Sequence, residues 1–131
     1  MKNNLIKSII AISFSLILGI SIHAHAASGD VTRSGNFTGA SDHVTKGKVE
    51  VLKMSDGYVV KLGSDFSLDG APDPKLAFGK GSAKPAIFAV LKSNNGEQTY
   101  KVPASINPDE YDTFYIWCEK YSVPLGVTSL K

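Results

Sequence analysis

The chain has 131 residues, of which 43% are hydrophobic and 20% charged, with a formal net charge of +2 at pH 7. This length is typical of one domain, and the absence of a large basic excess or a run of like charges argues against a nucleic-acid partner or an anionic membrane surface. The single cysteine, Cys118, excludes a disulfide within the chain.

The first 26 residues have the three parts of a secretory signal peptide. Lys2 and Lys7 precede an apolar run from Ile9 to Ile22, and the small-residue sequence AHA follows at 24–26. The apolar run is shorter than the roughly 20 residues of a membrane span, so we predict cleavage after Ala26 and no stable membrane insertion afterwards. The expected location of the mature protein is periplasmic or secreted.

Cleavage changes the charge and the chemistry of the chain. Loss of Lys2 and Lys7 lowers Lys plus Arg from 14 to 12, which equals the 12 acidic residues, so the mature net charge is 12 − 12 = 0. His23 and His25 also leave with the signal peptide. His43 is then the one histidine that can act as a base or a ligand.

Residues 27–36 are small and polar, and we predict a flexible leader there, with a short edge strand at Gly35 to Thr38. The domain itself is expected over residues 37–131. The strongest local signal is a hairpin between Lys48–Val51 and Tyr58–Leu62, turned at Asp56-Gly57.

The rest of the domain also has a β pattern. The sequence DGAPDP at 69–74 breaks any helix or central strand, and Asn107 with Pro108 predicts a single helical turn over Asn107–Glu110. Turn signals recur roughly every 8 to 12 residues, which predicts an all-β fold, a small antiparallel β-sandwich or barrel-like single domain. Further short strands are expected at Phe66–Leu68, Leu76–Phe78, Ile87–Leu91, Thr99–Val102, Thr113–Cys118 and Val123–Val127.

Cys118 closes the run Thr113–Cys118, in which side chains alternate between two faces. Ile116 and Cys118 then belong to a core face, and Tyr115 and Trp117 to the opposite face. On this interpretation Cys118 is a small buried hydrophobic residue. In an oxidising compartment, however, a free thiol needs either deep burial or a use.

Metal or haem binding is one such use. Cys118, His43 and Met54 offer a thiolate, an imidazole and a thioether, but a blue-copper site needs a second histidine, and no cysteine pair at zinc spacing or covalent haem motif occurs. Noncovalent copper or haem iron held by His43 and Cys118 stays open as a cofactor site, although their spacing does not favour it.

Nucleophilic catalysis is a second possible use. It would need His43 beside Cys118, with Asp42, Asp73 or Asn107 to orient the imidazole. Such residues occur in any domain of this size, so the sequence favours a role other than an enzyme. Asp73 lies between two prolines, where capping a turn is the more ordinary use of an aspartate.

Three segments together resemble the DM-thirteen domain family, whose members are small extracellular β domains. The match covers Phe37 to Leu130, and its most specific part is the Trp117-Cys118 pair with the downstream VPLG at 123–126. The three segments are HVTKGKV at 43–49, GAPDPKL at 70–76 and LKSNNGEQTYKVP at 91–103, the last followed by the Trp-Cys pair.

The resemblance implies a sandwich-like all-β domain and a role in electron transfer or another redox function that uses Cys118. This chain carries the domain without a second redox module, so its cofactor or electron partner is expected to come from elsewhere. A thiol–disulfide couple takes two sulfurs, and Cys118 supplies one of them.

Two functions are therefore weighed. The first is an exported redox domain with an extracytoplasmic redox partner protein, in which Cys118 ligates a cofactor with His43 or forms a mixed disulfide or sulfenic acid. The second is a non-catalytic binding module for a protein, a glycan or a small apolar ligand, in which Cys118 is inert. The second hypothesis draws on the outward Tyr115 and Trp117, and on the loop lysines Lys75, Lys80 and Lys84 as contacts for an anionic ligand or, more simply, as solvated charges.

Overall fold

The computed structural model describes residues 29–131, so the signal peptide predicted over 1–26 lies outside the described residues. The described part of the chain forms strands and one 3-10 turn, which confirms the all-β prediction. Within it, no helix is long and apolar enough to cross a membrane. The strands form several antiparallel sheets, as in a small β-sandwich.

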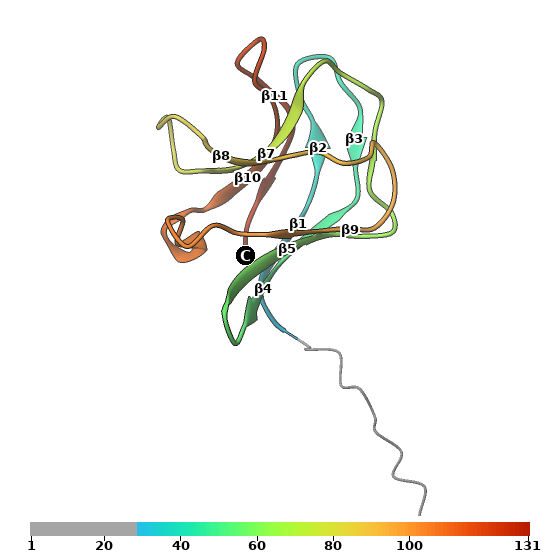
Figure 1. Cartoon of the computed structure of the whole chain (residues 1–131). Helices are drawn as coiled ribbons and strands as arrows, with labels where there is room; N and C mark the ends of the chain where they lie inside the picture. The colour runs from blue at the N-terminus through green and yellow to red at the C-terminus, as the bar shows by residue number, and fades with distance from the viewer. Residues whose placement is uncertain (1–28) are drawn as a thin grey trace, which may run out of the picture.

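The first sheet contains four antiparallel strands in the order β1, β4, β5 and β9. Their bounds are Asp30–Asn36 for β1, Lys48–Met54 for β4, Gly57–Leu62 for β5 and Gln98–Lys101 for β9. These strands lie in the lower half of the domain as drawn in Figure 1.

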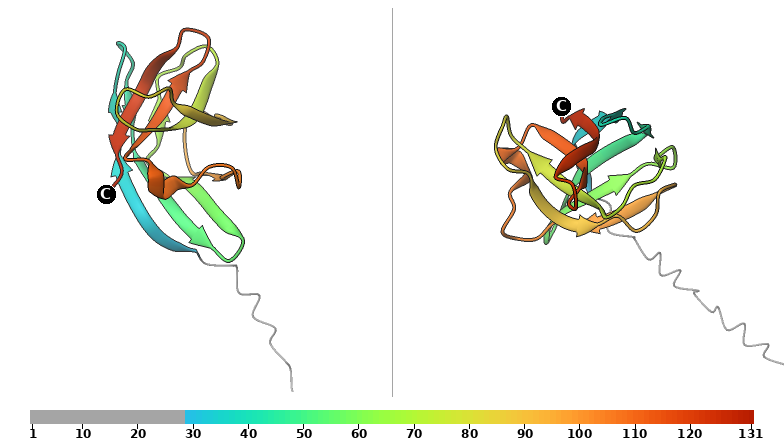
Figure 2. Two further views of the ribbon diagram at one scale, coloured as in Figure 1. Left: turned by 90° about the vertical axis from the view of Figure 1, so that its left-hand side faces the viewer. Right: turned by 90° about the horizontal axis from the view of Figure 1, so that it is seen from above.

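The second sheet contains five antiparallel strands in the order β2, β11, β10, β7 and β8. It lies above the first sheet in Figure 1, and the turned views of Figure 2 show it from two further sides. Its strands are β2 (Thr38–Gly39), β7 (Pro74–Gly79), β8 (Ala86–Val90), β10 (Thr113–Cys118) and β11 (Val123–Ser129), and a small two-stranded sheet joins β3 (Thr45–Lys46) to β6 (Ser67–Leu68).

The core is built from alternate positions of these strands. In β4, Val49 and Val51 are fully buried while their neighbours reach the surface, which is the period expected of a strand with one covered face. Phe78 of β7 and Phe114 of β10 are cross-strand partners whose ring centroids lie 5.0 Å apart in an edge-to-face arrangement. Phe37 packs on Phe114 from the segment that links β1 to β2.

Two local expectations are corrected. The leader predicted over residues 27–36 is instead strand β1 from Asp30 onward, because that polar segment pairs with β4 from Asp30 to Asn36, with one irregularity between Val31 and Arg33. The predicted hairpin is present, but Met54 pairs with Gly57, so its turn residues are Ser55 and Asp56. Gly57 follows them with a φ of 138°, a conformation that glycine adopts without strain.

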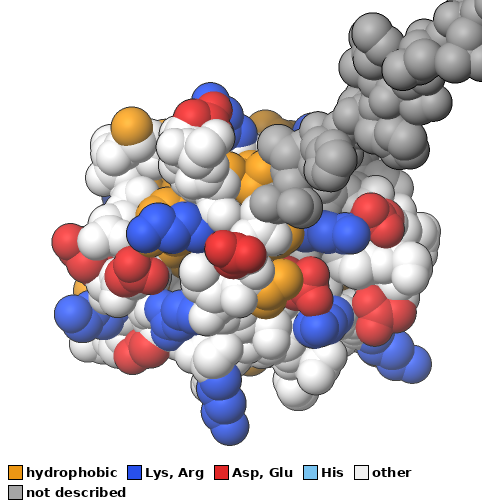
Figure 3. Space-filling model, turned by 90° about the horizontal axis from the view of Figure 1, so that it is seen from below, with side chains coloured by type: hydrophobic (Ala, Val, Ile, Leu, Met, Phe, Trp, Pro, Cys, Tyr) orange, Lys and Arg blue, Asp and Glu red, His pale blue; other side chains and the backbone are white. Residues whose placement is uncertain are grey.

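The helical turn expected over Asn107–Glu110 is confirmed as a 3-10 turn, η1 (Pro108–Glu110). Asn107 caps it, and its side-chain oxygen accepts a hydrogen bond from the backbone of Asp109. Charges of both signs are interspersed over the face drawn in Figure 3, with no large patch of one sign.

Arg33 of β1 connects this first strand to η1 and to the C-terminal segment that follows β11. Its guanidinium donates hydrogen bonds to the carbonyl oxygens of Pro108 and Leu130, at 3.1 and 2.9 Å, and also to that of Tyr111. The backbones of Ser34 and Lys131 exchange hydrogen bonds beside it, which places the end of the chain next to β1 (Figure 1). One fixed cation thus satisfies three main-chain acceptors that no strand ladder uses.

We expect Arg33→Met to lower the free energy of unfolding by about 2 kcal/mol, because it leaves three partly buried carbonyl groups without their charged donor. Arg33→Lys should recover only part of this loss, since an ammonium cannot reproduce the planar fork of donors. The measurement is urea unfolding, with Lys53→Met, at an exposed position of β4, as the control. Equal stability of the Arg33→Met and Lys53→Met variants would contradict this role.

Candidate functional site

Cys118 is the last residue of β10, and its side chain is 1% exposed. Because β10 pairs with β7 on one side and β11 on the other, its alternation is fixed, and Phe114, Ile116 and Cys118 all face the core. Trp117 lies on the opposite, partly exposed face, as the sequence predicts. The free thiol is therefore a buried residue at the edge of the core.

The Cys118 thiol has one polar partner. Its Sγ–H donates a hydrogen bond to the carbonyl oxygen of Pro72, at 3.1 Å. A carbonyl oxygen only accepts hydrogen bonds, so the thiol is the donor in this contact. In this arrangement Cys118 is closed to solvent and to nucleophilic attack on another molecule.

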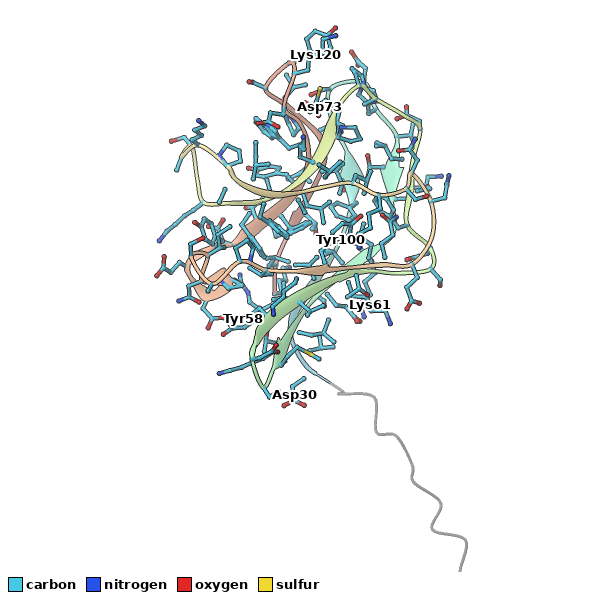
Figure 4. The ribbon with its side chains drawn as sticks, viewed as in Figure 1. Asp30, Tyr58, Lys61, Asp73, Tyr100 and Lys120 are labelled. Atoms are coloured by element: carbon cyan, nitrogen blue, oxygen red, sulfur yellow. The ribbon has the colours of Figure 1, made fainter. Side chains whose placement is uncertain are left out.

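The cover over Cys118 is the segment 69–73, which lies near the end of the domain marked by Asp73 and Lys120 in Figure 4. Pro72 and Asp73 are exposed, and Asp73 has a φ of 54°, in the left-handed region that non-glycine residues rarely adopt. Within the described chain, no backbone N–H of residues 70–73 donates to another backbone group. Backbone hydrogen bonds hold its two ends, from the Asp69 N–H to Val44 and from the Glu119 N–H to the Asp73 carbonyl, and side chains make its other contacts.

Asp73 takes part in one of these side-chain contacts. The Lys75 ammonium donates to the carboxylates of Asp73 and Glu119, at 3.0 and 3.3 Å, and these hydrogen bonds, with that to Asp73 the larger, raise the pKa of Lys75. Lys75 is therefore already paired, and a contact from it to an anionic ligand would compete with two carboxylates of its own chain. Asp73 shapes the turn, the use that the sequence favours for it.

His43 makes the other contact with the cover. Its Nδ1 lies 2.9 Å from Oδ1 of Asp69, and the hydrogen bond from His43 is the main cause that lowers the pKa of Asp69 below its ordinary value of 3.8. A backbone hydrogen bond from Asp69 to the Val44 carbonyl anchors the same point. His43 and Cys118 therefore hold opposite ends of one segment, through Asp69 and through Pro72.

No hydrogen bond joins His43 to Cys118 in the described chain. The partner of the imidazole is Asp69, rather than the Asp42, Asp73 or Asn107 considered from the sequence. Sequence reasoning missed Asp69 and the Pro72 carbonyl, although both belong to the breaker cluster that it singled out. Without a contact between base and thiol, the geometry provides no Cys–His nucleophile.

The donor set does not fit copper or haem iron bound at Cys118. Over the described residues, no group of three or more His, Cys, Asp or Glu side chains is arranged to hold a metal ion. A ligating sulfur presents a free lone pair, whereas Cys118 is enclosed and points its proton at Pro72. We therefore derive no chemistry through either cofactor.

The family model described as electron transfer DM13 matches residues 36–130. The chain belongs to the DM13 family. The matched range runs from the last residue of β1 to Leu130 after β11, so it includes Cys118, the cover segment and His43. No curated protein and no solved structure gives a significant match to the chain.

The contact between His43 and Asp69 predicts a pH-dependent contribution to stability. Because folding lowers the pKa of Asp69, the unfolded chain binds the proton first as the pH falls. The contribution is complete above about pH 4 and disappears as the pH falls through the lower, folded-state pKa.

The urea midpoint of the native chain should therefore exceed that of Asp69→Asn at about pH 5, and the difference should shrink as the pH is lowered from about 5 to about 2. Asp56→Asn is the matched control, because Asp56 is an exposed carboxylate with a lysine partner, Lys101, at 3.4 Å. A difference between native and Asp69→Asn that stays constant over this pH range would show that Asp69 does not act through its charge.

Proposed function

We propose that this DM13 domain is an exported electron-transfer domain whose redox group is Cys118. Electrons pass when Cys118 forms and releases a mixed disulfide with an extracytoplasmic partner, a protein or a small thiol. The proposal is supported by the family match, by the signal peptide predicted from the sequence and by the single thiol that the chain keeps. It invokes no nucleic acid and no stable membrane insertion.

The observation that carries the proposal is that the segment covering Cys118 has few backbone hydrogen bonds. The sulfur lies behind the segment 69–73, whose backbone takes little part in the sheets and whose Pro72 and Asp73 are exposed. Segments with few backbone hydrogen bonds open locally at a small free-energy cost, while the strands around them stay formed. Opening of this cover would expose the thiol of an otherwise folded domain.

The proposed step balances between two sulfurs. A disulfide R–S–S–R reacts with the Cys118 thiol to give Cys118–S–S–R and R–SH. The sulfur of Cys118 is oxidised, one sulfur of the partner is reduced, and the thiol proton leaves with that sulfur. A second thiol from the partner reverses the step, so the domain needs no second cysteine of its own.

The second candidate is a non-catalytic binding module. It is favoured by one observation, the complete burial of Cys118 with its proton held by Pro72. In that case the cover does not open under native conditions and the thiol is a core residue.

The test separates the two candidates by the route through which Cys118 reacts. Folded protein is incubated with oxidised glutathione at increasing urea below the unfolding transition, and the adduct is measured by intact mass spectrometry. We expect a Cys118 adduct whose rate hardly changes with urea, because local opening exposes little new surface. Asp69→Asn should speed the reaction, since it releases one end of the cover.

The matched control is Val60→Cys in a Cys118→Ala background, which places a thiol at another fully buried position, on the central strand β5. That thiol should react only in proportion to the globally unfolded fraction, with a steep dependence on urea. If Cys118 behaves like this control, the redox proposal is wrong and the binding module takes its place.

A further inference from the structure

The outer face of the second sheet contains a pocket on the reverse side of the strand that carries Cys118. Its volume is about 210 Å³, and it is lined by Lys84, Pro85, Ile87, Trp117, Glu119 and Ser122. The walls are thus an indole, a proline ring and an aliphatic side chain, with charged and hydroxyl groups at the rim. This volume lies below the roughly 300 Å³ at which drug-sized sites begin, so it fits a ligand of one or two rings.

The aromatic wall of the pocket is held in place by its neighbours. The rings of Tyr115 and Trp117 meet edge to face, with centroids 5.6 Å apart. A Cβ added to Gly79 would lie 2.2 Å from the Tyr115 ring, so this glycine is what allows the ring to lie flat on β7. Trp117 therefore packs against a fixed partner, and the site is largely formed before any ligand binds.

Ala77 is the small residue of β7 that lies on this outer face, next to the pocket. Ala77 pairs with Tyr115 on one side and Ile87 on the other, and it is fully buried although its strand neighbours Leu76 and Phe78 face the core. Ala77 is therefore covered by its larger neighbours, and the pocket lies beside it, lined from the loop before β8, from β8 and β10, and from the turn after β10.

The pocket lining carries one cation, Lys84, and one carboxylate, Glu119. The Glu119 carboxylate is paired with Lys75, whereas Lys84 makes no ion pair with any residue in the described range 29–131. Lys84 is therefore the cation of the lining that is free to pair with a ligand carboxylate beside the indole, while Glu119 disfavours an anionic group at its own end of the pocket. Anionic ligands are favoured by that cation, and planar aromatic ligands by the indole and the apolar walls.

We propose that this pocket binds a small aromatic carboxylate, with its ring against Trp117 and Ile87 and its carboxylate paired with Lys84. The inference goes beyond the redox role of Cys118 and does not rest on it, because Trp117 and Cys118 point to opposite faces of β10. It gives the domain a ligand class that its second candidate function leaves open.

The chain has a single tryptophan, so the indole N–H gives one signal in a nitrogen–proton correlation spectrum and reports on this pocket alone. The probes are 2-naphthoate and its uncharged counterpart 2-naphthamide, titrated into the folded protein. We expect a saturable shift of the indole signal with 2-naphthoate and weaker binding of the amide. An exposed ion pair accounts for a difference in affinity of about two- to fivefold.

Lys84→Gln should remove the preference for the acid, and Lys80→Gln, an exposed lysine of the same loop outside the pocket, should keep it. Both are surface changes, so unchanged backbone signals will report an intact fold. No saturable indole shift, or equal binding of acid and amide to the native chain, would overturn the proposal.

The same titration with the Cys118→Ser variant tests whether ligand binding by the pocket is independent of the redox role of Cys118. Serine keeps a donor for the Pro72 carbonyl, so 2-naphthoate should bind this variant as it binds the native chain. Loss of binding in Cys118→Ser with an intact fold would overturn the statement that the pocket acts without the thiol. An unreactive thiol with normal naphthoate binding would instead reject the redox proposal and leave the pocket in place.

Discussion

The placement of β10 between two antiparallel partners determines which of its side chains are buried and which reach the surface. A strand bonded on both sides cannot rotate or slip without losing two ladders, so each of its side chains is committed to one face. Cys118 is thereby sealed in the core while Trp117, its neighbour in the chain, is held at the surface. The adjacent Trp117 and Cys118 thus supply one residue to each side of a single strand.

The backbone of β10 is hydrogen-bonded on both sides, whereas the segment that covers its end has few backbone hydrogen bonds. Residues 69–73 contain two backbone-restricting features, a proline and a left-handed aspartate, yet no N–H group of residues 70–73 donates to another backbone group in the described chain. Three side chains outside the segment contact it. His43 contacts the Asp69 carboxylate, Lys75 contacts the Asp73 carboxylate, and Cys118 contacts the Pro72 carbonyl. The proposed redox role follows from this arrangement, in which the position of Cys118 is fixed by β10 while the covering segment 69–73 can open.

Much of this fold could be predicted from local sequence signals. The period of two in Thr113–Cys118 was sufficient to separate the buried from the partly exposed side chains, because a central strand leaves no other solution. The capped turn at Asn107 and the hairpin after Met54 also follow from local chemistry. β1 did not, because its polar residues carry no alternating pattern and its strand character comes from pairing with β4 and from the Arg33 contacts.

The site was less accessible to prediction, because its contacts join residues far apart in sequence. His43 was identified as a possible partner of Cys118, and its actual partner, Asp69, is 26 positions away. The partner of the thiol is a backbone carbonyl, which every residue carries and which no motif can single out. The Trp117 pocket likewise depends on the register of three strands, in which Ala77 of β7 lies between Tyr115 of β10 and Ile87 of β8.

Native-state amide hydrogen exchange, followed residue by residue, tests most directly whether a rigid β10 lies behind a loose cover. We expect the amides of Tyr115 to Cys118 to exchange among the slowest of the domain, and those of Gly70, Ala71 and Asp73 to exchange far faster under the same conditions. Equal protection of the cover and of β10 would contradict the account, because Cys118 would then be reachable only by unfolding the whole domain.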